Sequence, residues 1–445
     1  MTFDVVVVGG RCAGASLARF LARAGKRVVI VDAADFPSDQ PMSTHFIGIY
    51  GMRILDELGL GDKVREIAPT VHTFINGCEQ HVAHMKGEWG SCPRRDVLDA
   101  LLLEGAREAG AEIRTRTKLL ELLREGDRIV GALVEDAEGK HELRATIVVG
   151  ADGRNSTVAS LAGAEEYFGY DGPRSAYWSY WQRPSWYGSD PRYDGGAMIV
   201  YEQQYARVVF PTNRDQLCLG ATFPNAEVSA WKADPRAKLE AVLAASPYTA
   251  PLIADQGEPI EKIRGLVKIR YFFKRAAGKG WALAGDAGLH KDPHAGLGIS
   301  DALADAKALS QAILDGSEQA LERFWRERDV RAWELYNFTR DIGEVDYNNA
   351  LNQTLFRHVG ASKPLQERIY KVASRELSPY LAFTPGEIIK WTLGALVRGR
   401  FGVLPSFFRA ARRGASVAKE LERRKQLLTP ALAAAAPRSP DQIAA

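Results

Sequence analysis

Residues 4–32 constrain the fold more than any other part of the chain, because they combine a strand, a glycine-rich turn, a helix and a second strand. Val5–Val8 is a continuous run of β-branched residues, which is typical of a parallel strand buried on both faces. Ala15–Ala24 has a helical composition, Gly25 ends it, and Arg27–Val31 is the second strand. A βαβ unit of this kind predicts an α/β domain with a ligand at its glycine turn.

The turn departs from the usual G-x-G-x-x-G pattern and reads Gly9-Gly10-Arg11-Cys12-Ala13-Gly14. Gly9 permits a tight turn and Gly14 allows close helix packing, so that N–H groups of the helix N-terminus face a pyrophosphate. Asp32 ends the second strand, where a carboxylate bonds ribose hydroxyls. Arg11 replaces the middle glycine, and we hypothesise that its guanidinium points to the pyrophosphate or to an incoming nicotinamide nucleotide. A glycine turn after a strand also has purely structural interpretations.

Two further turns share one form, in which a buried apolar strand ends in a glycine and an aspartate. One reads Val149-Gly150-Ala151-Asp152-Gly153-Arg154; the other reads Leu283-Ala284-Gly285-Asp286-Ala287-Gly288 and continues through Asp292-Pro293-His294-Ala295-Gly296-Leu297-Gly298. We expect both aspartates at the carboxyl edge of the sheet, because α/β proteins bind their ligands there.

With these three motifs in this order, residues 3–310 resemble the group A flavoprotein monooxygenases, the family of para-hydroxybenzoate hydroxylase and phenol hydroxylase. The wider superfamily includes geranylgeranyl reductases and flavin-dependent halogenases. The resemblance implies bound FAD and an α/β fold: a glutathione-reductase-like, Rossmann-type FAD-binding domain with an inserted antiparallel β-sheet substrate domain and C-terminal helices. The three motifs are specific for this flavin fold but not for the reaction.

The resemblance also implies roles for residues of the third motif. Asp286, next to Gly285, would hold the ribityl chain or the pyrophosphate, and Pro293 would lie beside the isoalloxazine. A helix N-terminus would face the N1–C2=O edge of the flavin through the backbone of Gly296, Leu297 and Gly298. Reduced flavin carries negative charge near N1, which a helix N-terminus stabilises.

Other roles follow from the resemblance in the same way. Asp32 would hold the adenosine ribose. Arg95 matches an arginine that lies near the flavin ribityl chain, although a surface charge is the alternative. Asp152 resembles a residue that bridges the flavin and pyridine-nucleotide sites, but Ala159 stands where the family often has arginine, which leaves this part open. No second glycine-rich βαβ unit is visible, so NADPH or NADH would act as a transient reductant.

The composition of the chain changes from Tyr167 to about Thr222, where aromatic residues alternate with polar ones between glycines and prolines. This indicates an antiparallel sheet inserted between parts of the nucleotide domain. We predict an FAD-binding domain from 1–70, 95–165 and 260–315, a substrate-binding sheet domain from 71–94 and 166–259, a helical region from 316–429 and a disordered tail from 430–445.

Other reactions of the superfamily have their own sequence marks. Halogenases carry W-x-W-x-I-P, which Trp178–Pro184 does not match; prenyl reductases carry Y-x-W-x-F-P-K, and Arg207–Thr212 lacks its Trp and Lys. We therefore predict NAD(P)H-driven hydroxylation of an aromatic or polycyclic small molecule by molecular oxygen, through the flavin C4a-hydroperoxide that the resemblance implies. An FAD-dependent reductase or dehydrogenase of an alkene or prenyl substrate, and a non-catalytic flavin-fold binding protein, are the alternatives.

Two groups of side chains suit a phenolic substrate. The aromatic residues in Tyr177–Tyr187 either line a pocket for a flat apolar molecule or form the core of the sheet itself. A phenol also needs a base, and histidine titrates in the useful range. The candidates are His45, His290 and His294, with a structural or surface role as the alternative for each. No metal-ligand spacing is evident.

Charge and composition limit the partners. A formal net charge of +3 does not indicate nucleic acid. Four scattered cysteines without C-x-x-C indicate a reducing compartment, and we expect a cytoplasmic protein without signal peptide or membrane span. Ala395–Lys425 holds nine basic residues against two acidic ones, a local charge of +7. This segment either makes a weak peripheral contact with a membrane or carrier, or caps the FAD domain with a solvated face. The oligomeric state is not predicted.

Overall fold

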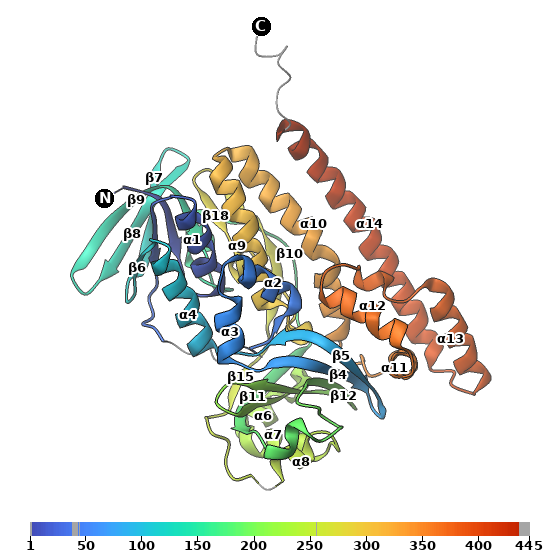
Figure 1. Ribbon diagram of the computed structural model, residues 1–445. Helices are drawn as coiled ribbons and strands as arrows, with labels where there is room; N and C mark the ends of the chain where they lie inside the picture. The colour runs from blue at the N-terminus through green and yellow to red at the C-terminus, as the bar shows by residue number, and fades with distance from the viewer. Residues whose placement is uncertain (1, 38–42, 44, 255, 436–445) are drawn as a thin grey trace.

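The computed structural model describes residues 2–37, 43, 45–254 and 256–435. Its first sheet has eight strands and a parallel centre (Figure 1), in the order β17 (Ala277–Gly278), β18 (Trp281–Leu283), β9 (Gly139–Gly150), β1 (Thr2–Val8), β2 (Val28–Val31) and β6 (Glu112–Arg114). The antiparallel strands β7 (Lys118–Glu125) and β8 (Arg128–Asp136) extend it from β9. This sheet confirms the predicted α/β fold.

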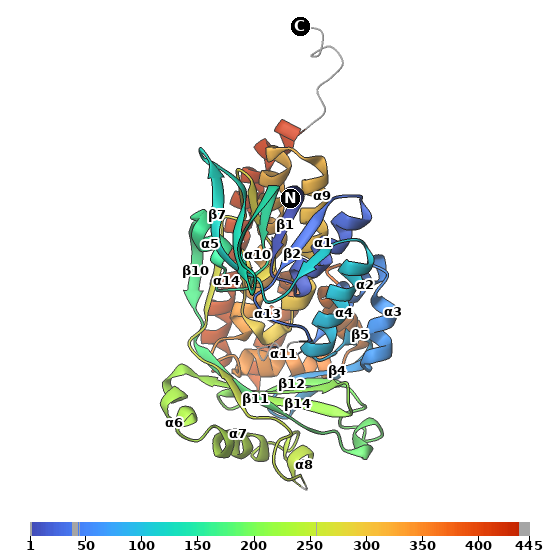
Figure 2. The same ribbon diagram turned by 90° about the vertical axis from the view of Figure 1, so that its left-hand side faces the viewer.

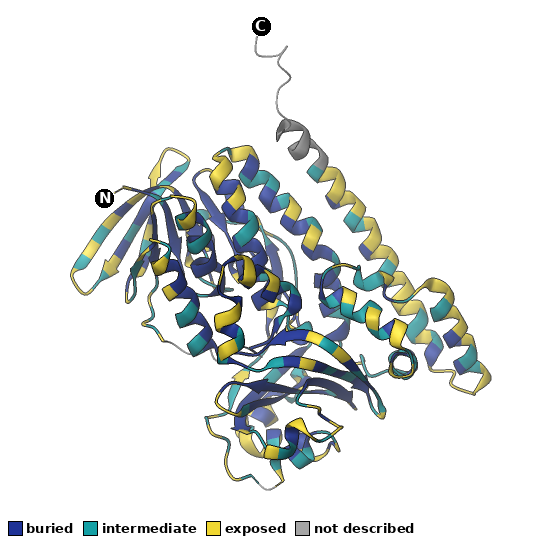
Figure 3. Cartoon of the chain, viewed as in Figure 1, coloured by how far each residue is buried: buried dark blue, intermediate teal, exposed yellow. Residues whose placement is uncertain are grey.

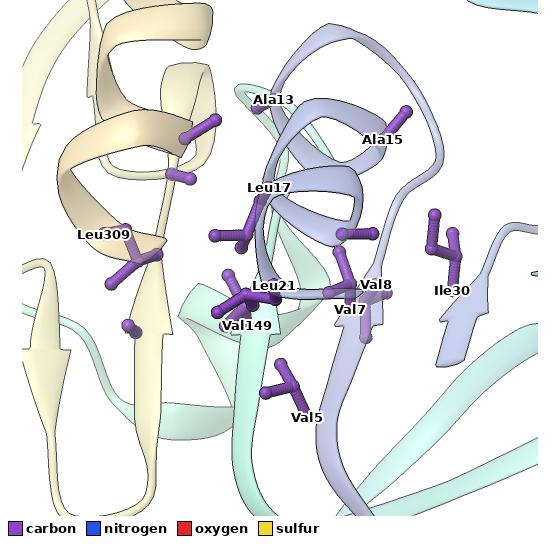
Figure 4. Close-up of a cluster of buried hydrophobic side chains, with 14 of the residues drawn as sticks. Val5, Val7, Val8, Ala13, Ala15, Leu17, Leu21, Ile30, Val149 and Leu309 are labelled. Carbon is purple, nitrogen blue, oxygen red and sulfur yellow. The ribbon is translucent and has the colours of Figure 1, made fainter. Parts of the chain in front are cut away.

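The core of this part lies around β1 and the two helices α1 (Cys12–Arg23) and α9 (Gly298–Asp315), which contact each other. Figure 4 shows Leu17 and Leu21 of α1 in one cluster with Val5, Val149 and Leu309. The β-branched run of β1 is buried, as expected for a strand with strands on both sides and helices against it. Four further helices complete this part: α2 (Ile49–Glu57), α3 (Gly61–Ile67), α4 (Arg95–Glu108) and α5 (Thr157–Ala162).

The second sheet also has eight strands, in the order β15 (Arg264–Leu266), β11 (Arg174–Gln182), β14 (Gln216–Pro224), β13 (Tyr205–Thr212), β12 (Ala197–Glu202), β4 (Thr70–Cys78), β5 (His81–Ser91) and β3 (Ile47–Gly48). All its pairs are antiparallel except β12 with β4. Figure 2 shows its outer side covered by α6 (Val228–Ala233), α7 (Pro235–Ala244) and α8 (Ala250–Ile253). Strands from both segments of the predicted substrate domain thus share one sheet.

A small sheet of β10 (Glu166–Asp171), β16 (Arg270–Lys274) and β19 (Leu289–His290) lies against the C-terminal helices. These helices are α10 (Glu318–Ile342), α11 (Ala350–Gly360), α12 (Lys363–Ala373), α13 (Pro385–Val397) and α14 (Val403–Ala435). α14 runs alongside α10 (Figure 1), and Trp333 of α10 donates from Nε1 to the Val417 carbonyl at 3.0 Å. The guanidinium of Arg424 lies 4.1 Å from the Trp333 ring centroid.

The C-terminal segment differs from its prediction in one respect. α14 extends through Ala435, so residues 430–435 of the predicted disordered tail are helical. The segment is rich in alanine, which has the highest intrinsic helix propensity. Residues 436–445 lie outside the described residues. Within the described ranges, no helix combines the length and apolarity needed to cross a membrane.

Candidate functional site

One cavity of about 660 Å³ lies where the carboxyl edge of the first sheet faces the second sheet. All three glycine turns line it. Of the residues predicted to bind the cofactor or to act as base, those that line the cavity are Gly9, Arg11, Ala13, Asp32, Arg95, Asp152, Gly285, Asp286, His290, Pro293, His294, Gly296, Leu297 and Gly298. Gly14 and His45 do not line it. The structure therefore gathers residues nearly 300 positions apart in the sequence at the edge where α/β proteins bind ligands.

The first turn owes its shape to two glycines. Gly9 has a φ of +105°, and a Cβ there would lie 2.4 Å from the carbonyl oxygen of Ala151, in the second turn. A Cβ at Gly14 would lie 1.8 Å from the Gly9 carbonyl oxygen. Asp32 accepts hydrogen bonds from the backbone N–H of Gly10 at 2.7 Å and of Ala34 at 2.8 Å. These contacts hold the turn, the aspartate and the second turn together.

Asp99 joins two cations at this turn, and sequence reasoning missed it. Its buried carboxylate accepts from Arg11 Nη1 at 2.8 Å, from Arg95 Nε at 3.0 Å and from Arg95 Nη2 at 2.9 Å. Burial opposes the charged form of Arg95, but Asp99 outweighs it and raises the pKa of the guanidinium above its ordinary value. The i,i+4 spacing of Arg95 and Asp99 on α4 was the available sequence signal.

The hypothesis that Arg11 contacts the pyrophosphate or a nicotinamide nucleotide remains a prediction. Arg11→Ala removes a cation that lines the cavity and one of the two arginines that bond Asp99, so we expect FAD to bind about tenfold or more weakly. Fluorescence titration of the apoprotein measures this. Arg27→Ala, which removes a largely exposed arginine, is the control. Unchanged affinity for both FAD and NAD(P)H would contradict the hypothesis.

Asp152 organises the second turn. Its carboxylate accepts from the Ser156 hydroxyl at 2.5 Å and from the N–H groups of Thr157 at 2.7 Å and Val158 at 3.2 Å, at the start of α5. Burial outweighs these hydrogen bonds and raises the pKa of the Asp152 carboxyl. The carboxylate thus both lines the cavity and caps the helix behind it. Its predicted role between the flavin and pyridine-nucleotide sites stays a prediction.

The third turn places two histidines at the cavity in different settings. His290 Nδ1 lies 3.3 Å from Asp286 Oδ2. His294 is buried between Asp292, which bonds its Nδ1, and Thr222 of β14, whose hydroxyl lies 2.9 Å from its Nε2. A carboxylate only accepts, so Nδ1 donates to Asp292 and Nε2 accepts from Thr222. Thr222 links the second sheet to the third turn, and no sequence pattern pointed to it.

His45 has a different environment from the other two candidates. It has no exposed surface and a φ of +63°, and its Nε2 lies 2.5 Å from the Tyr180 hydroxyl. Burial, together with the charges of Arg95 and Arg94, lowers the pKa of His45 well below its ordinary value. Thr44, beside it, lies outside the described residues. The imidazole is therefore neutral and does not line the cavity, an arrangement that favours its structural role over the predicted role as base.

This burial predicts a pH dependence of stability. The folded-state pKa of His45 lies below that of the unfolded chain, so only the unfolded chain takes up this proton below about pH 6.5. As the pH is lowered below this value, this group decreases the free energy of unfolding by up to about 1.4 kcal/mol per pH unit. We expect thermal denaturation to show a smaller loss of stability on acidification in His45→Gln than in the wild type. Equal losses would contradict a buried neutral His45.

Lys291 was also missed by sequence reasoning. It lines the cavity, is only 6% exposed, and its Nζ lies 2.5 Å from Asp301 Oδ2. Burial lowers the pKa of the Lys291 ammonium, although Asp301 opposes the shift. Arg375, from the region after α12, bonds the other Asp301 oxygen at 2.8 Å. The C-terminal region thus contributes to the wall behind the predicted flavin site.

The residues present fit a flavin dinucleotide. The N-termini of α1 and α9 line the same cavity, which suits a pyrophosphate and the N1 edge of a flavin. Among the described residues, Arg154 Nη1 is buried at this cavity without a hydrogen-bond partner, and thus remains available to an acceptor on a ligand. A Cβ at Gly298 would meet no protein atom within 4 Å. This chain therefore offers cations, backbone donors and open space where FAD is expected.

The second sheet supplies an apolar wall to the cavity, which includes Ala176, Trp178, Ile199, Val208, Phe210, Cys218, Gly220 and Leu266. The aromatic residues of 177–187 divide between this wall and the core. Trp178 belongs to the cavity wall, whereas Tyr177, Trp181 and Tyr187 lie in one core cluster with Trp231 on the side of α6 and α7. The aromatic run therefore divides between a cavity wall and the core of the sheet, since successive side chains of a strand point to opposite faces.

Comparison with known proteins agrees with this geometry. The profile of the family described as FAD binding domain matches residues 2–339. The chain is 28% identical over 357 residues to digeranylgeranylglycerophospholipid reductase 1 of Methanopyrus kandleri, covering 78% of this chain and 91% of that protein. It is 28% identical over 328 residues to 6-methylpretetramide 4-monooxygenase of Streptomyces rimosus, covering 70% and 75%. The flavin-dependent brominase Bmp2 shares the fold, with a TM-score of 0.73 at 16% identity over 90% of this chain and 100% of that chain.

Proposed function

Since the chain belongs to the FAD binding domain family and is an FAD-dependent oxidoreductase, we propose that it is an NAD(P)H-dependent monooxygenase that hydroxylates an aromatic or polycyclic small molecule. This proposal keeps the predicted reductants, NADPH or NADH, and the predicted cytoplasmic location. One NAD(P)H supplies a hydride and solvent supplies a proton. One atom of O2 then enters the substrate as a hydroxyl group, and the other leaves as water.

The observation that carries the proposal is the indole of Trp178. This side chain is 8% exposed and lines the apolar wall, and among the described residues its Nε1–H has no hydrogen-bond partner. A buried donor without an acceptor costs about 1–3 kcal/mol. A flat ring that carries an oxygen can pack against the apolar wall and accept a hydrogen bond from the Trp178 N–H. A hydrocarbon chain can only pack against the wall. The wall therefore favours a phenol, quinone or ring ketone.

FAD, when bound, supplies electron transfer from NAD(P)H and the activation of O2. Arg11, Arg95 and Asp32 would hold its pyrophosphate and ribose. The chain itself supplies a proton path: the Thr222 hydroxyl accepts from a substrate O–H and donates to His294 Nε2. Asp292 bonds Nδ1 and so orients the imidazole with Nε2 toward Thr222. A phenolate formed in this way is more electron-rich than the phenol and is hydroxylated more readily.

A rapid-mixing experiment tests this function. The purified protein is reduced anaerobically and mixed with oxygenated buffer in the presence of phenols and polycyclic ring ketones. We expect a transient absorbance change that appears after the reduced flavin has reacted and before the oxidised flavin spectrum forms. We also expect the product to contain one ¹⁸O atom from ¹⁸O2. Substrate-independent reoxidation, with hydrogen peroxide in place of product across these compounds, would argue against a monooxygenase. A protein that purifies without flavin and binds none would favour the non-catalytic alternative.

Reduction of an alkene or prenyl chain is the second candidate. The apolar wall and the similarity to a digeranylgeranylglycerophospholipid reductase favour it. The two candidates differ in their need for oxygen. Anaerobic conversion of a prenyl substrate by the reduced protein, with loss of a C=C bond and no oxygen incorporation, would support this reductase and reject the monooxygenase.

A further inference from the structure

The hairpin of α13 and α14 exposes apolar side chains to an unusual degree. Among the described residues, the six most exposed large hydrophobic side chains all lie between positions 381 and 408. They are Val397 at 89%, Phe401 at 68%, Leu381 at 62%, Phe408 at 58%, Leu393 at 57% and Ile389 at 49%. Figure 3 shows the turn between α13 and α14 as exposed, at the lower right of the molecule. This apolar surface lies outside the catalytic cavity.

The exposed side chains form a continuous pattern. Ile389, Leu393 and Val397 are four residues apart on α13 and so share one face of the helix. Phe401 lies in the turn that follows, and Phe408 lies in the second turn of α14. The opposite face of α13 is buried through Trp391 and Ala395. In the described part of the hairpin, α13 thus packs on the protein through one face, and the opposite face is exposed.

The central part of this hairpin carries only positive charge. Residues 388–419 contain seven lysines and arginines and no aspartate or glutamate. Arg398 and Arg400 flank the turn next to Phe401, and Lys390 and Arg412 are exposed on the two helices. Within the described part of the chain, no carboxylate forms an ion pair with any of these four. Cations therefore surround the apolar side chains, free to interact with external anions.

The basic charge continues along α14. A groove of about 870 Å³ between α10 and α14 is lined by Phe408, Arg412 and Arg340. Its other arginines have partners: Arg409 pairs with Asp346, Arg413 with Asp341 and Glu344, and Arg423 with Glu420. The unbalanced charge is thus concentrated next to the exposed hairpin.

We propose that the α13–α14 hairpin docks on the surface of an anionic lipid bilayer. The apolar stripe of Ile389, Leu393 and Val397, together with Phe401, enters the interfacial region, and Arg398 and Arg400 bind lipid phosphates. Interfacial binding is strongest when apolar area and basic residues act together, as they do here. An acidic protein partner would bind the arginines, but it would not require such an extended and widely exposed apolar stripe. The proposal does not depend on the reaction of the FAD site.

The test uses the full chain with bound FAD and vesicle sedimentation. We expect binding to vesicles of phosphatidylcholine with phosphatidylglycerol, little binding to phosphatidylcholine alone, and a decrease with salt. Arg398→Gln with Arg400→Gln is expected to weaken binding about tenfold or more. Val397→Ser with Phe401→Ser should weaken it comparably. Ile260→Ser, which alters a 47% exposed side chain elsewhere, is the matched control and should bind like the wild type.

All variants should retain the wild-type melting temperature and flavin content, because the substituted side chains are exposed. A full-length protein that stays in the supernatant with anionic vesicles would overturn the proposal. Binding to polyglutamate that is as strong as binding to vesicles, and is unaffected by Val397→Ser with Phe401→Ser, would also overturn it, since that result indicates an acidic protein partner instead.

Discussion

The Gly14→Ala variant is expected to purify without FAD and to unfold at a lower temperature than the wild type. A methyl group at this position would lie 1.8 Å from the carbonyl oxygen of Gly9. That neighbour is backbone of the tight turn, so the helix must move away from β1. Overpacking of this kind costs about 1–3 kcal/mol, and the displaced turn loses its hydrogen-bond geometry toward the pyrophosphate. Flavin absorbance of the purified protein and its thermal denaturation measure both effects.

Substitutions at two other glycines distinguish loss of stability from loss of FAD binding. At Gly298 a Cβ meets no protein atom within 4 Å but lies where the flavin edge is expected. Gly298→Val should therefore leave the stability of the apoprotein nearly unchanged and still abolish FAD binding. Gly414, within α14, also has open space, and Gly414→Ala should keep FAD and gain about 0.5–1 kcal/mol. A Gly14→Ala protein with full flavin content would show that the turn does not bind the pyrophosphate.

The second large effect is expected for His294→Asn. It removes the group that accepts from Thr222 at 2.9 Å, so a substrate proton has no path from the cavity. We expect formation of hydroxylated product to fall about 10²–10³-fold, as for loss of a general base, while reduction of FAD by NAD(P)H continues near the wild-type rate. Single-turnover measurements of flavin reduction and of product formation distinguish the two steps.

The hydroxyl of Thr222 provides a matched control. Thr222→Ser keeps the hydroxyl and should retain most activity, whereas the isosteric Thr222→Val breaks the path and should lose product formation without loss of flavin reduction. If His294→Asn slows both steps equally, the histidine has a structural role between Asp292 and Thr222, and the proposed proton path is wrong.

Local sequence patterns were sufficient for the nucleotide fold. Val5–Val8 is apolar on both faces, and only a strand covered on both sides can satisfy such a run. Gly9 and Gly14 allow contacts that a Cβ would prevent, so the glycine pattern reports backbone geometry directly. These constraints act over a few residues, which explains why the sequence alone determined the α/β fold and the FAD family, and why most of the residues predicted to bind the cofactor line the cavity.

Only the tertiary structure decided which side chains meet inside that cavity. Asp99, which bonds Arg95 on its own helix, also bonds Arg11 across 88 positions, and Thr222 reaches His294 across 72. The sequence identified His45 and His294 as equal candidates, but packing buried the first against Tyr180 and placed the second at the cavity. The sequence of β11 indicates that Trp178 and Trp181 point to opposite faces of the strand, but it does not indicate which of the two faces the cavity. Strand register and domain packing bring distant side chains together, and no local pattern records them.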